Sequence, residues 1–162
     1  MTRPNLLVLA MVFVWITTTP SLSAQPPRAD GAAEKDILKP EANDDELRKL
    51  LKERYNVATR EYAIYMSRLD IDPLAHFQEQ LFACCRRRAE VAQEIFAKPD
   101  DQIQILKKLL DEAKNLEMVF VKRNQGAGIG AVMPQDVERA RGARLDVEIM
   151  LVKAKQKAKP AK

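Results

Sequence analysis

The chain has 162 residues, enough for one domain, and a formal net charge of +4. Hydrophobic residues make up 46% of it and charged residues 31%, the balance of a protein with a packed core and a solvated surface. Aromatic residues are only 6% and there are five glycines, which favours helices over sheets. A closed zinc site would lack ligands, because the chain has one histidine and two cysteines.

Residues 1–24 have the pattern of a secretory signal peptide. Arg3 gives a positive start, and Leu6–Ile16 forms an apolar stretch too short to span a bilayer comfortably. We expect cleavage after Ala24, with Ser23 as the neighbouring alternative, and an uncleaved anchor is the other interpretation. The pattern therefore predicts export, to a periplasmic or extracellular location.

A spacer and four helices are expected after the leader. Residues 25–43 are rich in Pro and Ala and lack an apolar period, which predicts a flexible linker. Asn43 or Asp44 is a suitable N-cap for the first helix, and prolines suit the first turns of the other three. Apolar residues at helical spacing predict helices over 44–69, 73–97, 99–124 and 134–154.

The second of these segments should have neighbours on more than one side, inside a bundle. Leu74–Ala97 carries two adjacent apolar rows, wider than a two-stranded coiled coil needs. The other helices each show a main apolar row with flanking residues. The first helix is expected to bury Leu47, Leu51, Ala58, Tyr62, Tyr65 and Leu69, widened by Leu50 and Val57. The fourth is expected to bury Val137, Ala140, Leu145, Ile149 and Val152, with Val147 and Leu151 beside them.

These elements predict an all-α protein. Similar helix lengths and short breaks indicate a four-helix up-down bundle over residues 44–154, followed by a basic tail at 155–162. The alternative is two consecutive long antiparallel hairpins, coiled-coil-like, that do not close on each other. A faint echo of the first helix in the third, about 59 residues on, suggests a duplicated hairpin.

Cys84 and Cys85 are adjacent, so a disulfide between them does not fit a regular helix. Both lie on apolar rows, which favours two small buried residues. The alternative is an intermolecular disulfide through whichever thiol faces outward. Arg88 also falls on an apolar row, and Glu117 interrupts a row of the third helix. We therefore expect an ion pair between Arg88 and Glu117 that fixes helix register.

The sequence carries no catalytic arrangement: no metal-binding helix motif, no glycine-flanked nucleophile and no Ser-His-Asp order. We predict a protein that is not an enzyme, with no cofactor and no metal. Near the C-terminus, lysines follow Glu148 with no acid among them, which suits a solubilising helix end or weak contact with an anionic envelope surface. The lysines concerned are Lys153, Lys155, Lys157 and Lys159. Nucleic acid is not expected as a partner, because no aromatic residues are interleaved.

The third and fourth helices resemble the helical-hairpin segment of outer-membrane efflux proteins. The resemblance rests on Gly126 and Gly128 in the turn, Asp136-Val137, Ala140-Arg141, and the set Leu145, Glu148 and Ile149. The first two helices look like a more divergent copy, so the match spans residues 50–154 at most. This chain has no strand signal and is too short for the whole fold of that family. The resemblance implies a helical protein of the envelope, not a transport channel.

The sequence predicts an exported, non-enzymatic helical protein with a structural or interaction role in the cell envelope, through self-association or an unidentified protein partner. One alternative is an accessory subunit of an envelope efflux or transport assembly, with its hairpins docked on partner helices. Another is a helical bundle that binds a small molecule or metal. Exposed apolar rows on the first or fourth helix would favour docking, whereas a closed core would favour a stand-alone bundle.

Overall fold

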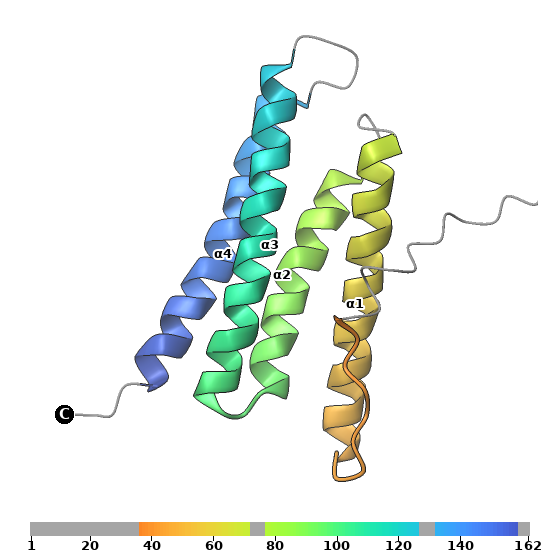
Figure 1. The fold of residues 1–162 in the computed structure, drawn as a ribbon, viewed down its shortest axis with the longest axis vertical. Coiled ribbons are helices and arrows are strands. Elements are labelled where there is room, and N and C mark those ends of the chain that lie inside the picture. Colours follow the sequence, from red (N-terminus) through yellow and green to blue (C-terminus); the bar gives the residue numbers. More distant parts are fainter. Residues whose placement is uncertain (1–35, 72–76, 127–131, 159–162) are drawn as a thin grey trace, which may run out of the picture.

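The computed structural model describes residues 36–71, 77–126 and 132–158, and within them the secondary structure is helical (Figure 1). The four helices are α1 (Glu46–Ile71), α2 (Gln78–Ile95), α3 (Pro99–Gln125) and α4 (Pro134–Ala158). The all-α prediction is confirmed. The expected signal peptide, its cleavage at Ala24, the Pro73 start of the second helix and Lys159 lie outside the described residues.

The helix ends follow local capping. Asp45 precedes α1, and its Oδ1 accepts a hydrogen bond from the backbone N–H of Arg48 at 2.7 Å, so this residue is the N-cap in place of Asn43 or Asp44. Pro99 occupies the first turn of α3, as expected. At the other end of the chain, α4 continues to Ala158, so Lys155 and Lys157 belong to the helix and not to a tail.

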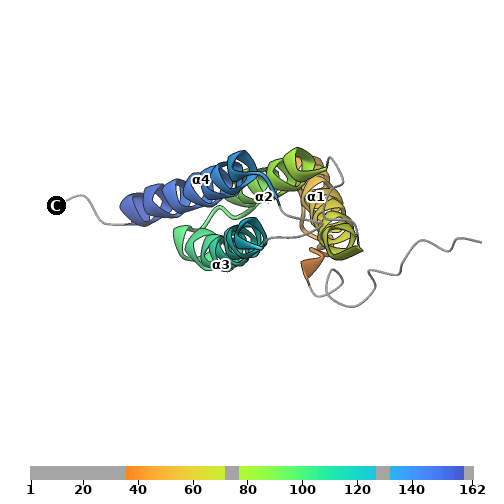
Figure 2. The same cartoon turned by 90° about the horizontal axis from the view of Figure 1, so that it is seen from above.

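α2 is the central helix of the arrangement, since α1, α3 and α4 all pack against it. α3 and α4 form the most extensive antiparallel pair, and α1 forms a second pair with α2. Viewed from above, α4, α2 and α1 lie in a row with α3 on one side of it (Figure 2). Because α2 separates them, α1 and α4 make no extensive contact. The bundle is therefore open: α1 packs against α2 and α4 packs against α2 and α3, so each of the two keeps a face that no other helix covers.

Two apolar clusters fill the interior. The first core cluster lies toward the α2–α3 turn and includes Tyr55, Ala92, Leu109 and Leu151. The second core cluster lies toward the other end of the helices; there the rings of Phe82 and Phe120 meet at 5.0 Å. As predicted, both apolar rows of α2 are buried within its described span; the buried members are Leu81, Phe82, Cys84, Cys85, Ala89, Val91, Ala92 and Ile95.

The predicted core faces of the outer helices were partly wrong. Leu47, Leu50 and Val57 of α1 are exposed, and so are Leu145, Ile149 and Val152 of α4. On α4 the packed residues are mostly small; they are Val137, Ala140, Ala143, Val147, Leu151 and Ala154, with Asp136. The outer helices carry apolar residues on more than one face, and the open arrangement covers only one of these.

The end of the predicted linker is ordered against α1. The side chain of Asn56 donates to the carbonyl of Leu38 at 2.9 Å and accepts from its backbone N–H at 2.8 Å. The ammonium of Lys52 donates to the carboxylate of Asp44 at 2.6 Å and to that of Glu41 at 3.0 Å. Residues 36–45 are therefore part of the fold, which corrects the prediction of a flexible spacer up to residue 43.

Candidate interaction surface

The outer face of α1 carries an exposed apolar row, here called the α1 stripe: Leu47, Leu50, Val57 and Ile64. Their exposed fractions are 65%, 54%, 40% and 43%. Leu50, Val57 and Ile64 recur every seven residues, the repeat with which one helix packs along another. Aligned apolar side chains of this kind mark a surface that other apolar groups can cover.

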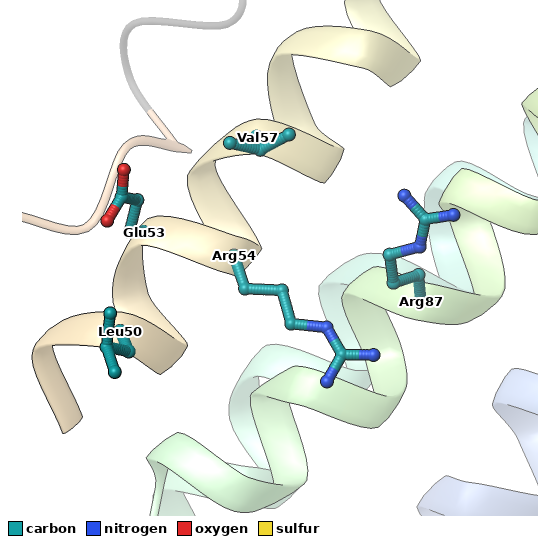
Figure 3. Close-up of a pocket in the computed structure, with 5 residues that line it drawn as sticks. All are labelled: Leu50, Glu53, Arg54, Val57 and Arg87. Carbon is teal, nitrogen blue, oxygen red and sulfur yellow. The ribbon is translucent and has the colours of Figure 1, made fainter. Parts of the chain in front are cut away.

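A shallow hollow of about 490 Å³ opens beside the α1 stripe. Leu50, Glu53, Arg54 and Val57 line it from α1, and Arg87 lines it from α2 (Figure 3). The side chain of Arg54 extends from α1 toward α2 (Figure 3). The hollow is open to solvent and bordered by charges, so it suits a side chain of a docked helix better than an enclosed small molecule.

The α2 wall of this hollow is held by an ion pair. Arg87 donates to a carboxylate oxygen of Glu61 on α1 at 3.2 Å, and the thiol of Cys84 donates to the same oxygen at 3.4 Å. Both charged side chains are about two-fifths exposed, so the pair contributes little to stability, about 1 kcal/mol or less. It nevertheless orients Arg87 at the edge of the surface.

Charges flank the α1 stripe in a regular order. At about 100° per residue, Glu53 and Arg60 lie roughly 40–60° to one side of Val57, and Arg54 and Glu61 lie the same distance to the other side. Each flank therefore holds one acid and one base. On the first flank the acid, Glu53, precedes the base, Arg60, along the chain. On the second flank the order is reversed, since the base, Arg54, precedes the acid, Glu61.

The predicted partner of Arg88 was wrong. Arg88 is 1% exposed, and its Nη1 donates to an Oε of Glu112 at 2.6 Å. Glu117 instead accepts from Arg144 at 2.6 Å and from Arg141 at 3.2 Å. Glu112 and Glu117 are five residues apart, about 140° around a helix, so they face different neighbours. Glu112 faces α2, whereas Glu117 faces α4.

The buried guanidinium of Arg88 stays charged. Burial acts to lower its pKa, but the carboxylate of Glu112 and the hydroxyls of two tyrosines outweigh burial and raise the pKa above its usual value. Its carbon Cζ lies 4.8 Å from the ring centre of Tyr62 and 5.9 Å from that of Tyr55, within cation–π range. These contacts hold the cation in the core, although its Nε has no hydrogen-bond partner among the described residues.

Cys84 and Cys85 are both buried with free thiols. Burial, followed by the hydrogen bond to Glu61, raises the pKa of Cys84 to about 12. Burial also raises the pKa of Cys85 to about 11. A thiol must ionise to act as a nucleophile or to exchange disulfides, so neither cysteine is activated. An intermolecular disulfide would require this part of α2 to become accessible first.

The remaining predicted residues lie on the surface. Lys153, Lys155 and Lys157 are exposed on the last turns of α4. Among the described residues, no three His, Cys, Asp or Glu side chains come together as metal ligands would. None of the helices in residues 36–71, 77–126 and 132–158 is both long enough and apolar enough to cross a membrane.

Sequence reasoning missed Glu112 and the contacts that Asn56 and Lys52 make with residues 38–44. The polar groups concerned look like ordinary solvated positions in the sequence, and only the placement of the neighbouring segment reveals their partners. Comparisons of this chain with models of protein families, with curated proteins and with solved structures find no match.

Proposed function

We propose that this chain is an exported, non-enzymatic helical protein with a structural or protein-interaction role in the cell envelope, and that it acts by self-association through the α1 stripe. The observation that carries the proposal is the exposed heptad row Leu50, Val57 and Ile64, on a face of α1 that no other helix covers. The leader-like sequence of residues 1–24 supports the envelope location.

The charges beside the stripe favour a second copy of the same chain as the occupant. In an antiparallel pair of α1 helices centred on Val57, Leu50 meets Ile64 of the second copy. On one flank, Glu53 then lies opposite Arg60 of the second copy; on the other, Arg54 lies opposite its Glu61. Neither Glu53 nor Arg60 has an ion-pair partner among the described residues. The pairing would give every flanking charge an opposite neighbour.

The alternative is an accessory role, in which a helix of a different envelope protein covers the same stripe. It is favoured by the same exposed row and by the resemblance of the hairpins to those of outer-membrane efflux proteins. It differs in one respect that can be measured, since it predicts a monomer when the protein is alone in solution.

The test is the solution mass of residues 25–162, which include every described residue, measured by light scattering with and without reductant. We expect a dimer in both conditions, and we expect Val57→Glu to weaken it by at least about 100-fold, because it buries two unpaired carboxylates at the interface. Val152→Glu is the matched control, since Val152 is exposed to a similar extent on α4, and this variant should remain dimeric.

Each other outcome contradicts part of the proposal. A wild-type monomer would reject self-association and make the accessory role the one to pursue. A dimer unaffected by Val57→Glu would place the interface elsewhere. A dimer dissolved by reductant would assign the link to Cys84 or Cys85.

The orientation of the pair is tested by a charge exchange. Glu53→Arg should weaken the dimer several-fold, because it faces Arg60 of the second copy with a like charge. Adding Arg60→Glu should restore the affinity in an antiparallel pair. In a parallel pair, position 53 would instead lie beside Arg54 of the second copy, and position 60 beside its Glu61. The double exchange would then set like charges together at both places, and binding would weaken further.

A further inference from the structure

α4 has an outer face that the α1 stripe does not involve. Leu145, Ile149 and Val152 are 41%, 50% and 46% exposed and follow one another at helical spacing. At about 100° per residue they point away from the side of Val147 and Leu151, which are buried in the core. The C-terminal turns of α4 lie at the edge of the molecule farthest from α1 (Figures 1 and 2).

The charges around this face that have no ion-pair partner among the described residues are positive. Asp146 is paired with Arg86 of α2 at 3.3 Å, and Glu148 is paired with Arg144 at 2.5 Å. From residue 149 to the end of α4 there is no acidic residue. Lys153, Lys155 and Lys157 are exposed there, and none has an acidic partner among the described residues. We call this set, the three aliphatic residues and the three lysines, the α4 outer face.

We propose that the α4 outer face rests on an anionic lipid surface, with the helix lying in the plane of the membrane. Leu145, Ile149 and Val152 would enter the boundary between headgroups and acyl chains, and the lysines would contact lipid phosphates. Lysine stems are long and apolar, so their ammonium groups can reach the headgroups while the stems cover the apolar row.

A lipid surface fits this face better than a protein partner does. The three aliphatic side chains are bordered by lysines that have no acidic partner among the described residues, so a second copy of this face would add positive charge to positive charge. Shallow insertion of an amphipathic helix needs only such a row together with neighbouring basic charge. The contact is independent of the proposed self-association, because the α1 stripe lies on α1, which α2 separates from α4.

The test is co-sedimentation of residues 25–162 with vesicles of phosphatidylcholine, with and without phosphatidylglycerol. We expect binding only to the vesicles that contain phosphatidylglycerol, weakening as salt is added. Changing Lys153, Lys155 and Lys157 to Gln should weaken binding by about fivefold per lysine. The matched control changes Lys107, Lys114 and Lys122 of α3, which are also exposed, and alters the net charge equally.

A second pair of variants tests the apolar part. Ile149→Ser should weaken binding several-fold, whereas Met118→Ser, at a similarly exposed apolar residue of α3, should leave it unchanged. Circular dichroism verifies that each variant is folded. Equal binding to vesicles without phosphatidylglycerol, equal losses in the two lysine triples, or no binding by the unaltered chain would each overturn the proposal. A change of solution mass in Ile149→Ser would show that the face contacts protein instead.

Discussion

Arg88 and Glu112 form an unequal pair. The Arg88 side chain is 2% exposed, whereas that of Glu112 is 25% exposed. If Arg88 is lost, the carboxylate can turn to water, but if Glu112 is lost, the cation stays in the core. The Nε of Arg88 already lacks a hydrogen-bond partner among the described residues, so no other group is ready to replace Glu112.

This inequality predicts an order of stabilities. Glu112→Ala should lower the free energy of unfolding by about 3 kcal/mol, because it strands a buried charge. Arg88→Leu with Glu112→Leu should cost about 1 kcal/mol or less, since apolar side chains then replace both charges. Urea unfolding of both variants measures the order. If the double variant were as unstable as Glu112→Ala, or unfolded with lost cooperativity, the pair would fix helix register, the role that the sequence predicted for Arg88 with Glu117.

The two thiols give a second prediction at this scale. Cys84 and Cys85 are buried and their pKa values are raised, chiefly by burial, so in the native protein at pH 8 an alkylating reagent should react with them only through opening of the fold. We expect alkylation, followed by mass spectrometry, to be at least about 100-fold slower than in urea. Rapid alkylation of either cysteine in the folded protein would contradict this prediction and would favour the alternative of an intermolecular disulfide.

At the scale of elements, the sequence predicted α2 better than its neighbours. Both apolar rows of α2 are buried because helices cover α2 from several sides. The prediction for α2 therefore did not depend on which of its faces is covered. α1 and α4 have apolar residues on two faces, and periodicity does not state which face the rest of the chain covers. Val57 and Ile149 were therefore assigned to the core and lie on the surface. The same limit applies to Glu112, whose partner depends on how two helices are placed.

The segment before α1 provides the prediction at this scale. Asn56 holds Leu38 by two hydrogen bonds, together worth about 2 kcal/mol. Asn56→Ala should release the segment around Leu38, whereas Lys52 still holds Asp44 and α2, α3 and α4 stay folded. Amide hydrogen exchange should show the loss of protection at Leu38. Asn115→Ala, at an exposed asparagine of α3, is the matched control and should change nothing. Global unfolding by Asn56→Ala would show that the segment is essential to the bundle.

At the scale of the whole molecule, the all-α class followed from composition and period, but the openness of the bundle did not. Helix lengths and short connections fit both a closed bundle and two hairpins. The structure places α2 between α1 and α4, which leaves two separate outer surfaces on opposite flanks. The α1 stripe and the α4 outer face are consequences of this placement, so neither could be read as a surface from the sequence.

The interior as a whole predicts a loss of stability in alkali. Cys84, Cys85, Tyr55 and Tyr62 all have raised pKa values, and burial is the largest cause for each. A group whose pKa is higher in the folded state contributes its full stability below the pKa of the unfolded chain, near 9 for a thiol. That contribution is lost as the pH rises toward about 11 for Cys85 and about 12 for Cys84, because only the unfolded chain releases the proton easily.

We therefore expect the free energy of unfolding in urea to fall between pH 8 and pH 10, by about 1 kcal/mol for each thiol. The variant Cys84→Ala with Cys85→Ala should lose correspondingly less over the same range, although it is less stable at pH 8, where two small cavities replace the sulfurs. A tyrosine control, Tyr62→Phe, should change the fall mainly above pH 10, where an ordinary phenol ionises. Parallel pH profiles for the unaltered chain and the cysteine variant would show that the thiols ionise as readily in the folded protein as in the unfolded one, and that α2 opens to solvent at Cys84 and Cys85.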